Sequence, residues 1–291
     1  MSANDPVTHH DLIYDLGMNN GDDTAYYLLC GFRVVAVEAN PALVAAARHR
    51  FASELAAGRL TLLNVGVAPV RGTATFWICD EKDAISSFSR EHAGHLGRPV
   101  RAVDIECCPF DELVGRFGMP HYLKIDLEGL DLHCLSVLTS TAKPRFISLE
   151  LSDADALWRL RELGYKRFKI IDQRNWHRSF HHEPGFDRVR RAVRDWPGVG
   201  VMRRVVRRAS RDLLGRVMAS RDATEVTVGD GSRVVWKFPY GSSGAFGDHA
   251  RGHWRSFDDA VYTWLSYRRG LTRFDERPHR RLEWFDVHAT V

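Results

Sequence analysis

Three carboxylates stand close together after a short apolar run in the middle of the chain. The run is Tyr122–Ile125, and the acids are Asp126, Glu128 and Asp131. Carboxylate oxygens are the ligands that Mg²⁺ prefers, and an ionised carboxylate can also take a proton from a hydroxyl group. The run has the length of a buried strand, so the acids would follow the end of that strand. A structural alternative stays open, because these residues could instead cap the next helix and order the loop.

A glycine turn near the start of the chain is a second place where a ligand could bind. An apolar run precedes Gly17, Gly21 follows four residues later, and a helical pattern then begins. Such a turn lets a ligand approach bare backbone at the beginning of a helix. We predict that it contributes these cofactor-binding residues: Asp15, Gly17, Asn19, Gly21 and Thr24.

The ends of the next two expected strands supply further cofactor-binding candidates. An acid after the strand 33–37 can accept both ribose hydroxyls of a nucleoside cofactor, and the end of the strand 60–65 would face the adenine. Asp126, on the neighbouring strand, should face the glycine turn across the same crevice. The candidates at the first two strand ends are Glu38, Ala39, Asn64 and Gly66.

The residues around the glycine turn also favour one cofactor over another. A dinucleotide fingerprint reads G-x-G-x-x-G, whereas this turn reads Gly17-x-Asn19-x-Gly21 and is preceded by Asp15. An acid there would repel a pyrophosphate but would suit the ammonium group of S-adenosylmethionine. The sequence therefore favours a methyl donor. A nicotinamide-dependent oxidoreductase remains the alternative, since Glu38 and the strand–turn–helix pattern permit it.

Strand and helix patterns alternate along the first two thirds of the chain. This order predicts an α/β fold with a doubly wound, mostly parallel, seven-stranded sheet and a helical insertion before its last strand. We expect residues 234–238 to be that last strand, and the glycine- and serine-rich residues 239–247 to gate the substrate. The expected divisions are a cofactor-binding core (1–172), an arginine-rich helical insertion or lid (173–233), and a final part that completes the core (234–291).

The segment 188–221 carries eleven arginines and two aspartates. Most charged faces of this kind are simply solvated, but the segment could form a lid or bind an anion or a nucleic acid. A nucleic-acid-modifying enzyme is thus an alternative, although the charge is confined to one segment without a recognisable binding motif. Just before it, His182 in a His-His-Glu cluster is a further candidate for a catalytic base.

Three segments resemble the FkbM-type methyltransferases in order and spacing. They are Asp-Leu-Gly-Met-Asn-Asn-Gly-Asp-Asp-Thr (15–24), Val-Glu-Ala-Asn-Pro (37–41) and Leu-Lys-Ile-Asp-Leu-Glu-Gly (123–129). The resemblance covers about residues 11–172. It implies a Rossmann-like, class I enzyme that uses S-adenosylmethionine to methylate a hydroxyl group of a sugar or natural product. The residues expected to take the hydroxyl proton are Asp126, Glu128 and His182, and Mg²⁺ on Asp126, Glu128 and Asp131 stays an open alternative.

Composition indicates the cellular compartment of the protein and the class of partner that it binds. The chain of 291 residues has a formal net charge of +4 and five cysteines without a CxxC pair. We expect reduced thiols and a cytoplasmic protein, because the polar first ten residues also lack a secretory h-region. No apolar run approaches the ~20 residues that span a bilayer, so we expect no membrane partner. The expected partner is a small hydroxyl-bearing molecule, and a homodimer stays open.

Overall fold

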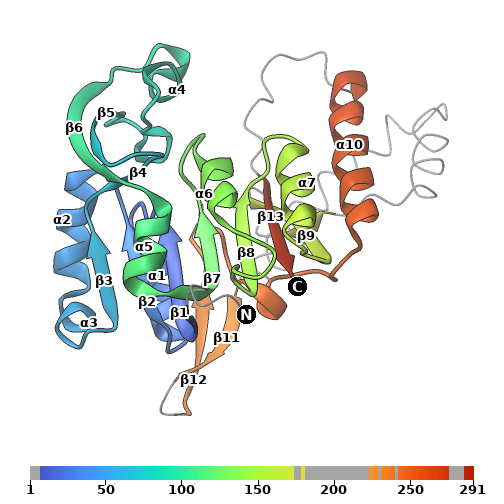
Figure 1. The fold of residues 1–291 in the computed structure, drawn as a ribbon, viewed down its shortest axis with the longest axis horizontal. Helices are drawn as coiled ribbons and strands as arrows, with labels where there is room; N and C mark the ends of the chain where they lie inside the picture. Colours follow the sequence, from blue (N-terminus) through green and yellow to red (C-terminus); the bar gives the residue numbers. More distant parts are fainter. Residues whose placement is uncertain (1–6, 174–177, 181–222, 229–230, 240–241, 275–284) are drawn as a thin grey trace, which may run out of the picture.

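Eight strands form the main sheet of the computed structural model, which describes residues 7–173, 178–180, 223–228, 231–239, 242–274 and 285–291 (Figure 1). Their order across the sheet is β10-β9-β13-β8-β7-β1-β2-β3. Among them, β13 and β10 run antiparallel to their neighbours and the other pairs are parallel. The strands are β1 (Thr8–Leu16), β2 (Arg33–Val37), β3 (Leu60–Leu63), β7 (Met119–Ile125), β8 (Phe146–Glu150), β9 (Arg167–Asp172), β10 (Arg178–Phe180) and β13 (Phe285–Thr290).

The register of the central strands brings three chain segments to one edge of the sheet. In β1, Leu16 pairs with Val37 of β2 on one side and with Ile125 of β7 on the other. Parallel strands end at the same edge, so the residues that follow these three positions leave the sheet together. This is the edge where a doubly wound sheet binds its ligands.

Helices cover both faces of the sheet, because the side chains of each strand alternate between two apolar clusters. Tyr14 and Leu16 pack with α5, α6, α7 and α10, while Ile13 packs with α1 and α2. The helices are α1 (Asp22–Leu29), α2 (Pro41–Arg50), α3 (Ala52–Ala56), α4 (Arg90–Ala93), α5 (Phe110–Phe117), α6 (Asp131–Val137), α7 (Asp155–Glu162) and α10 (Phe257–Phe274). None of the described helices is long and apolar enough to cross a membrane.

A smaller, three-stranded sheet stands beside the main one, and Figure 1 draws it at the upper left with α4. It consists of β4 (Gly66–Val67), β5 (Gly72–Ile78) and β6 (Arg101–Cys108), in the order β4-β6-β5. The segment between β5 and β6 returns to the main sheet, where Ser87 Oγ donates to the carbonyl oxygen of Glu128 at 3.3 Å. The small sheet thereby holds a covering segment over the end of β7.

The prediction that residues 234–238 form the last strand of the main sheet is wrong. β12 (Arg233–Lys237) pairs with β11 (Ala223–Thr227) in a separate hairpin, where Val234 and Val235 are 39% and 58% exposed. The last strand is β13, which lies between β8 and β9. With β13 in that place, seven strands have the expected mostly parallel arrangement, and β10 is added at the edge.

The described part of the glycine- and serine-rich loop is packed against the core. The Phe246 ring stacks on Tyr122 with their centroids 4.3 Å apart, and the backbone N–H of Ser243 donates to Asp23 at 2.9 Å. These contacts make the described part of the loop a buried element, and its role as a substrate gate stays a prediction. The arginine-rich segment 188–221 lies outside the described residues.

Candidate active site

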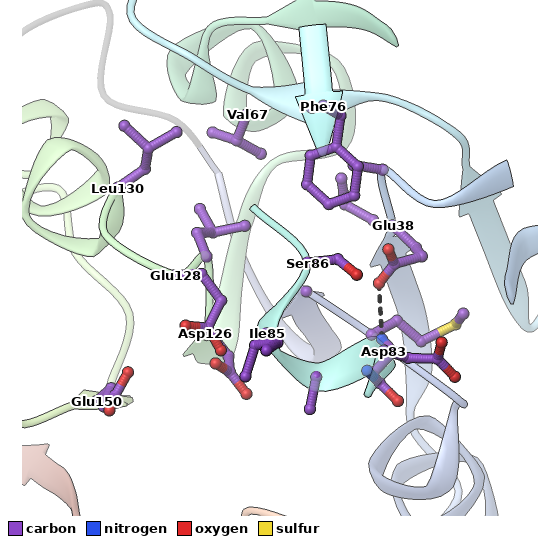
Figure 2. A pocket seen from close by; sticks show the side chains of 18 of the residues that line it. Glu38, Val67, Phe76, Asp83, Ile85, Ser86, Asp126, Glu128, Leu130 and Glu150 are labelled. Carbon is purple, nitrogen blue, oxygen red and sulfur yellow. Dashed lines mark hydrogen bonds between the residues drawn. The ribbon is translucent and has the colours of Figure 1, made fainter. Parts of the chain in front are cut away.

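A cavity of about 610 Å³ opens at the edge where β1, β2 and β7 end (Figure 2). Its wall is made by the glycine turn, by the covering segment after β5, and by the ends of β7 and β8. The predicted residues that line it are Gly17, Asn19, Glu38, Ala39, Gly66, Asp126 and Glu128. Five others are placed outside the lining: Asp15, Gly21, Thr24, Asn64 and Asp131. His182 lies outside the described residues.

The glycine turn joins three strands at one point. The backbone N–H groups of Gly17 and Met18 both donate to the carbonyl oxygen of Val37, each at 3.0 Å. Gly17 has a φ of +80°, and a Cβ atom there would stand 1.9 Å from the carbonyl oxygen of Asp126. Only glycine accepts both constraints. The turn thus holds the ends of β1, β2 and β7 close together.

Glu38 is the buried acid of the turn. Its carboxylate accepts the backbone N–H of Asn19 and that of Asn40, both at 2.8 Å, and its exposed fraction is 7%. Burial raises the pKa of Glu38, although the two backbone hydrogen bonds oppose that shift. A carboxylate can accept about four hydrogen bonds, so two backbone donors leave capacity for ligand hydroxyls.

An apolar recess lies beside Glu38. Phe76 and Phe88 meet edge to face with centroids 5.0 Å apart, and Val67 lines the same cavity. A Cβ atom on Gly66 would come within 2.4 Å of the Phe88 ring, so this position favours glycine. Asn64 does not line the cavity but supports its wall. Its side-chain amide donates to the backbone carbonyl oxygens of Glu38 and Ala39, each at 3.0 Å.

Asp15 does not face the cavity, which corrects the idea that its charge meets the cofactor directly. It is fully buried and accepts Thr24 Oγ1 at 2.6 Å and Lys124 Nζ at 3.0 Å. Lys124 also lies 3.6 Å from Asp23 and 3.8 Å from Asp126. Burial alone would lower the pKa of Lys124, but the three carboxylates outweigh it and raise that pKa well above its usual value.

Three acids line the other half of the cavity, where Figure 2 draws Asp126 and Glu128 between Glu38 and Glu150. Burial raises the pKa of Asp126 to about 6, and Lys124 opposes that shift. Burial, with Asp126 next in effect, raises the pKa of Glu128 to about 9. Burial, again with Asp126 next, raises the pKa of Glu150 to about 7. Asp126 is therefore the most readily ionised of the three at neutral pH.

Glu128 and Asp131 have structural partners. Glu128 has a φ of +49° and lies 2.7 Å from Nε2 of His92, which the covering segment supplies. Asp131 Oδ1 accepts the backbone N–H of Leu127 at 3.2 Å, so it orders the loop as the cap interpretation expected. In the described part of the chain, no three His, Cys, Asp or Glu side chains are grouped as metal ligands would be. This donor set does not fit the Mg²⁺ site that the sequence had left open.

Among the cavity residues that sequence reasoning missed are three that carry ionisable side chains, namely His92, Lys124 and Glu150. Glu150 ends β8 just as Asp126 follows β7, so the same strand-end argument could have found it. Lys124 precedes Asp126 inside a buried strand, where a charged residue signals a partner. His92 comes from a distant segment, and no local pattern marks it, whereas Ser242 belongs to the glycine- and serine-rich loop that the sequence had singled out.

The chain is similar to one family of known proteins over more than half of its length. The methyltransferase FkbM domain matches residues 15–173. Among solved structures, methyltransferase FkbM from Methylobacillus flagellatus KT is 16% identical, with a TM-score of 0.36, over 55% of this chain and 39% of that one. Precorrin-6y C5,15-methyltransferase from Geobacter metallireducens GS-15 is 15% identical, with a TM-score of 0.30, over 57% of this chain and 71% of that one. No curated protein matches the chain.

The chain spans about two fifths of the length of the Methylobacillus protein, at 39%. The match to the FkbM domain covers more than half of this chain, and it includes the glycine turn, Glu38 and Asp126. This protein belongs to the FkbM methyltransferase family.

Proposed function

We propose that this protein is an S-adenosylmethionine-dependent O-methyltransferase that acts on a hydroxyl group of a sugar or natural product. One observation carries the proposal: a single cavity has Glu38, after β2, and Asp126, after β7, on its wall. The first suits the ribose of a nucleoside cofactor, and the second suits a proton acceptor. The five cysteines are unpaired, in keeping with a cytoplasmic location.

The residues of the cavity fit this cofactor. Glu38 keeps hydrogen-bonding capacity for two ribose hydroxyls, and Val67 and Phe76 offer apolar surface to an adenine. Asp126, after β7, would attract the positively charged part of S-adenosylmethionine, whereas it would repel the pyrophosphate of a nicotinamide nucleotide. When bound, S-adenosylmethionine supplies an activated methyl group.

Asp126 is the proposed general base. A neutral hydroxyl is a poor nucleophile, and its proton must leave as the new oxygen–carbon bond forms and the sulfur–carbon bond breaks. With a pKa of about 6, Asp126 is mostly ionised at neutral pH and can accept that proton. Glu128, with a pKa of about 9, is mostly protonated there and is better placed to donate a hydrogen bond. The role of His182 as a catalytic base stays a prediction, because that residue lies outside the described residues.

Replacing Glu38 by alanine should weaken the binding of S-adenosylmethionine by about 1–3 kcal/mol, the cost of leaving ribose hydroxyls unpaired. Titration calorimetry on the folded variant measures the change. Glu54→Ala is the matched control, since that acid lies on α3 outside the cavity lining. Equal affinity in wild type and Glu38→Ala would remove Glu38 from the cofactor site.

The proposed reaction can be tested without knowing the acceptor. A metabolite extract is incubated with the enzyme and methyl-labelled S-adenosylmethionine, and mass spectrometry and NMR locate the label. We expect a product labelled on oxygen, which is absent when Asp126→Asn replaces the wild type. A label found only on nitrogen or carbon would contradict the O-methylation assignment.

A further inference from the structure

Glu150 differs from the other partly buried acids of the cavity in having no partner. Its carboxylate forms no hydrogen bond or ion pair with any residue that the structure describes. Asp83 is exposed, and the remaining acids of the lining each have one or more partners: Asp22 with Arg50, Asp23 with Lys124 and Ser243, Glu38 with Asn19 and Asn40, Asp126 with Lys124, and Glu128 with His92. A partly desolvated carboxylate without a donor is costly, so a ligand that brings one is the natural complement.

The surroundings of Glu150 are rich in carboxyl groups. The groups that act on it or feel its charge are all carboxyls among the described residues: Asp126, Glu128, Asp131 and Asp286. Repulsion from Asp126 and Asp131 adds to burial in raising the pKa of Glu150. Lys124, a buried cation of the same cavity lining, is already paired with Asp15 at 3.0 Å. A ligand group with positive charge would therefore be attracted here, and an anionic group would be repelled.

The position of Glu150 separates it from the cofactor end of the cavity. Figure 2 draws Glu38 and Glu150 on opposite sides, with Asp126 between them in that view. If the ribose lies at Glu38 and the proton acceptor is Asp126, then Glu150 lines the space left for the methyl acceptor. A cavity of about 610 Å³ has room for a cofactor and a small second ligand.

We propose that Glu150 binds an ammonium group of the methyl acceptor, so that the substrate is a hydroxyl compound that also carries a basic amine, such as an amino sugar or an amino alcohol. This inference rests on the proposed function and names the substrate class for the same site. An ammonium group held by Glu150 has no lone pair, so the methyl group goes to the hydroxyl and not to the nitrogen. Glu150 thus determines which acceptor binds, whereas Asp126 accepts the proton of its hydroxyl group.

The first arm of the test examines the labelled product from the metabolite extract. The product is expected to keep a basic amine, to be retained on a cation exchanger, and to carry the label on oxygen. A product that carries a carboxylate or phosphate and no amine would overturn the inference while leaving O-methylation intact. If S-adenosylhomocysteine binds but no acceptor is labelled on oxygen, the proposed function fails and the inference falls with it.

The second arm compares wild type, Glu150→Gln and Glu162→Gln by calorimetry, with the acceptor identified above and saturating S-adenosylhomocysteine. Glu162 is an exposed acid on α7 outside the cavity lining, so it is the matched control. We expect Glu150→Gln to weaken acceptor binding by about 30-fold or more. KM for the acceptor should rise by a similar factor, while kcat should stay within a few-fold of the wild-type value. Glu162→Gln should behave as wild type.

Two readouts separate recognition of the acceptor from other roles of Glu150. Glu150→Gln should bind S-adenosylhomocysteine as wild type does, and a selective loss of that affinity would assign the carboxylate to the cofactor and overturn the inference. Urea unfolding should show stability equal to or above that of wild type, because an unpaired charge has been removed. Unchanged acceptor affinity in this folded variant would also overturn it.

Discussion

Replacing Lys124 by methionine should lower the free energy of unfolding by about 3–5 kcal/mol, because breaking a buried ion pair leaves a charge without compensation. Lys124 is 3% exposed and its Nζ atom donates to Asp15, which is fully buried, at 3.0 Å. It also donates to the carbonyl oxygen of Gly17 at 3.2 Å, so the loss would reach the glycine turn. Urea unfolding followed by circular dichroism measures the change.

The double variant Lys124→Met/Asp15→Asn separates the charge effect from lost packing. If the uncompensated Asp15 charge causes most of the loss, neutralising it should restore a large part of the stability. The loss of Lys124 should destabilise the charges of Asp23 and Asp126 less, because these carboxylates lie farther from its Nζ atom, at 3.6 Å and 3.8 Å. A cost below about 1 kcal/mol for Lys124→Met alone would mean that Lys124 does not neutralise this cluster.

Replacing Asp126 by asparagine should slow methyl transfer by about 10²–10⁴-fold, the usual contribution of a general base. The change keeps the shape of the side chain, so affinity for S-adenosylmethionine should stay within about 1 kcal/mol. Single-turnover rates with the acceptor from the extract measure the effect. Asp131→Asn is the matched control from the same loop, because its carboxylate caps Leu127 and should cost about 1 kcal/mol of stability with little change in rate.

The pH dependence of the same rate has a definite sign. The base form of Asp126 is the ionised one, and its pKa of about 6 lies well above the ordinary value. The wild-type rate should therefore rise as pH increases through about 6 and level off above it, and Asp126→Asn should lose that step. A near-normal rate in the folded variant would rule out Asp126 as the base.

The sequence predicted the inner strands well because each is a short apolar run with a clear end. β2 matches the expected range 33–37, and the ends of β1 and β7 lie where expected. The last strand was misplaced because local pattern does not reveal which sheet a strand joins. β12 is rich in valine yet forms a hairpin, whereas β13 buries Asp286, His288 and Thr290 and so lacks an apolar pattern.

The same difference between local and long-range features explains which site residues the sequence located and which it did not. Strand ends are local features, and they located Glu38 and Asp126 on the cavity wall. Partnerships between distant segments are not local, so the pairing of Asp15 with Lys124, 109 positions away, could not be read from either segment. The contact of His92 with Glu128 depends on how the segment between β5 and β6 packs over the end of β7. The spacing of residues in the sequence does not predict that packing.

Titration calorimetry of the wild type with S-adenosylhomocysteine, NADH and an oligonucleotide tests most directly whether the cavity binds a methyl donor. We expect saturable binding of S-adenosylhomocysteine that weakens in Glu38→Ala, with no comparable binding of NADH or the oligonucleotide. Binding of NADH in a Glu38-dependent manner, together with no binding of S-adenosylhomocysteine, would contradict it.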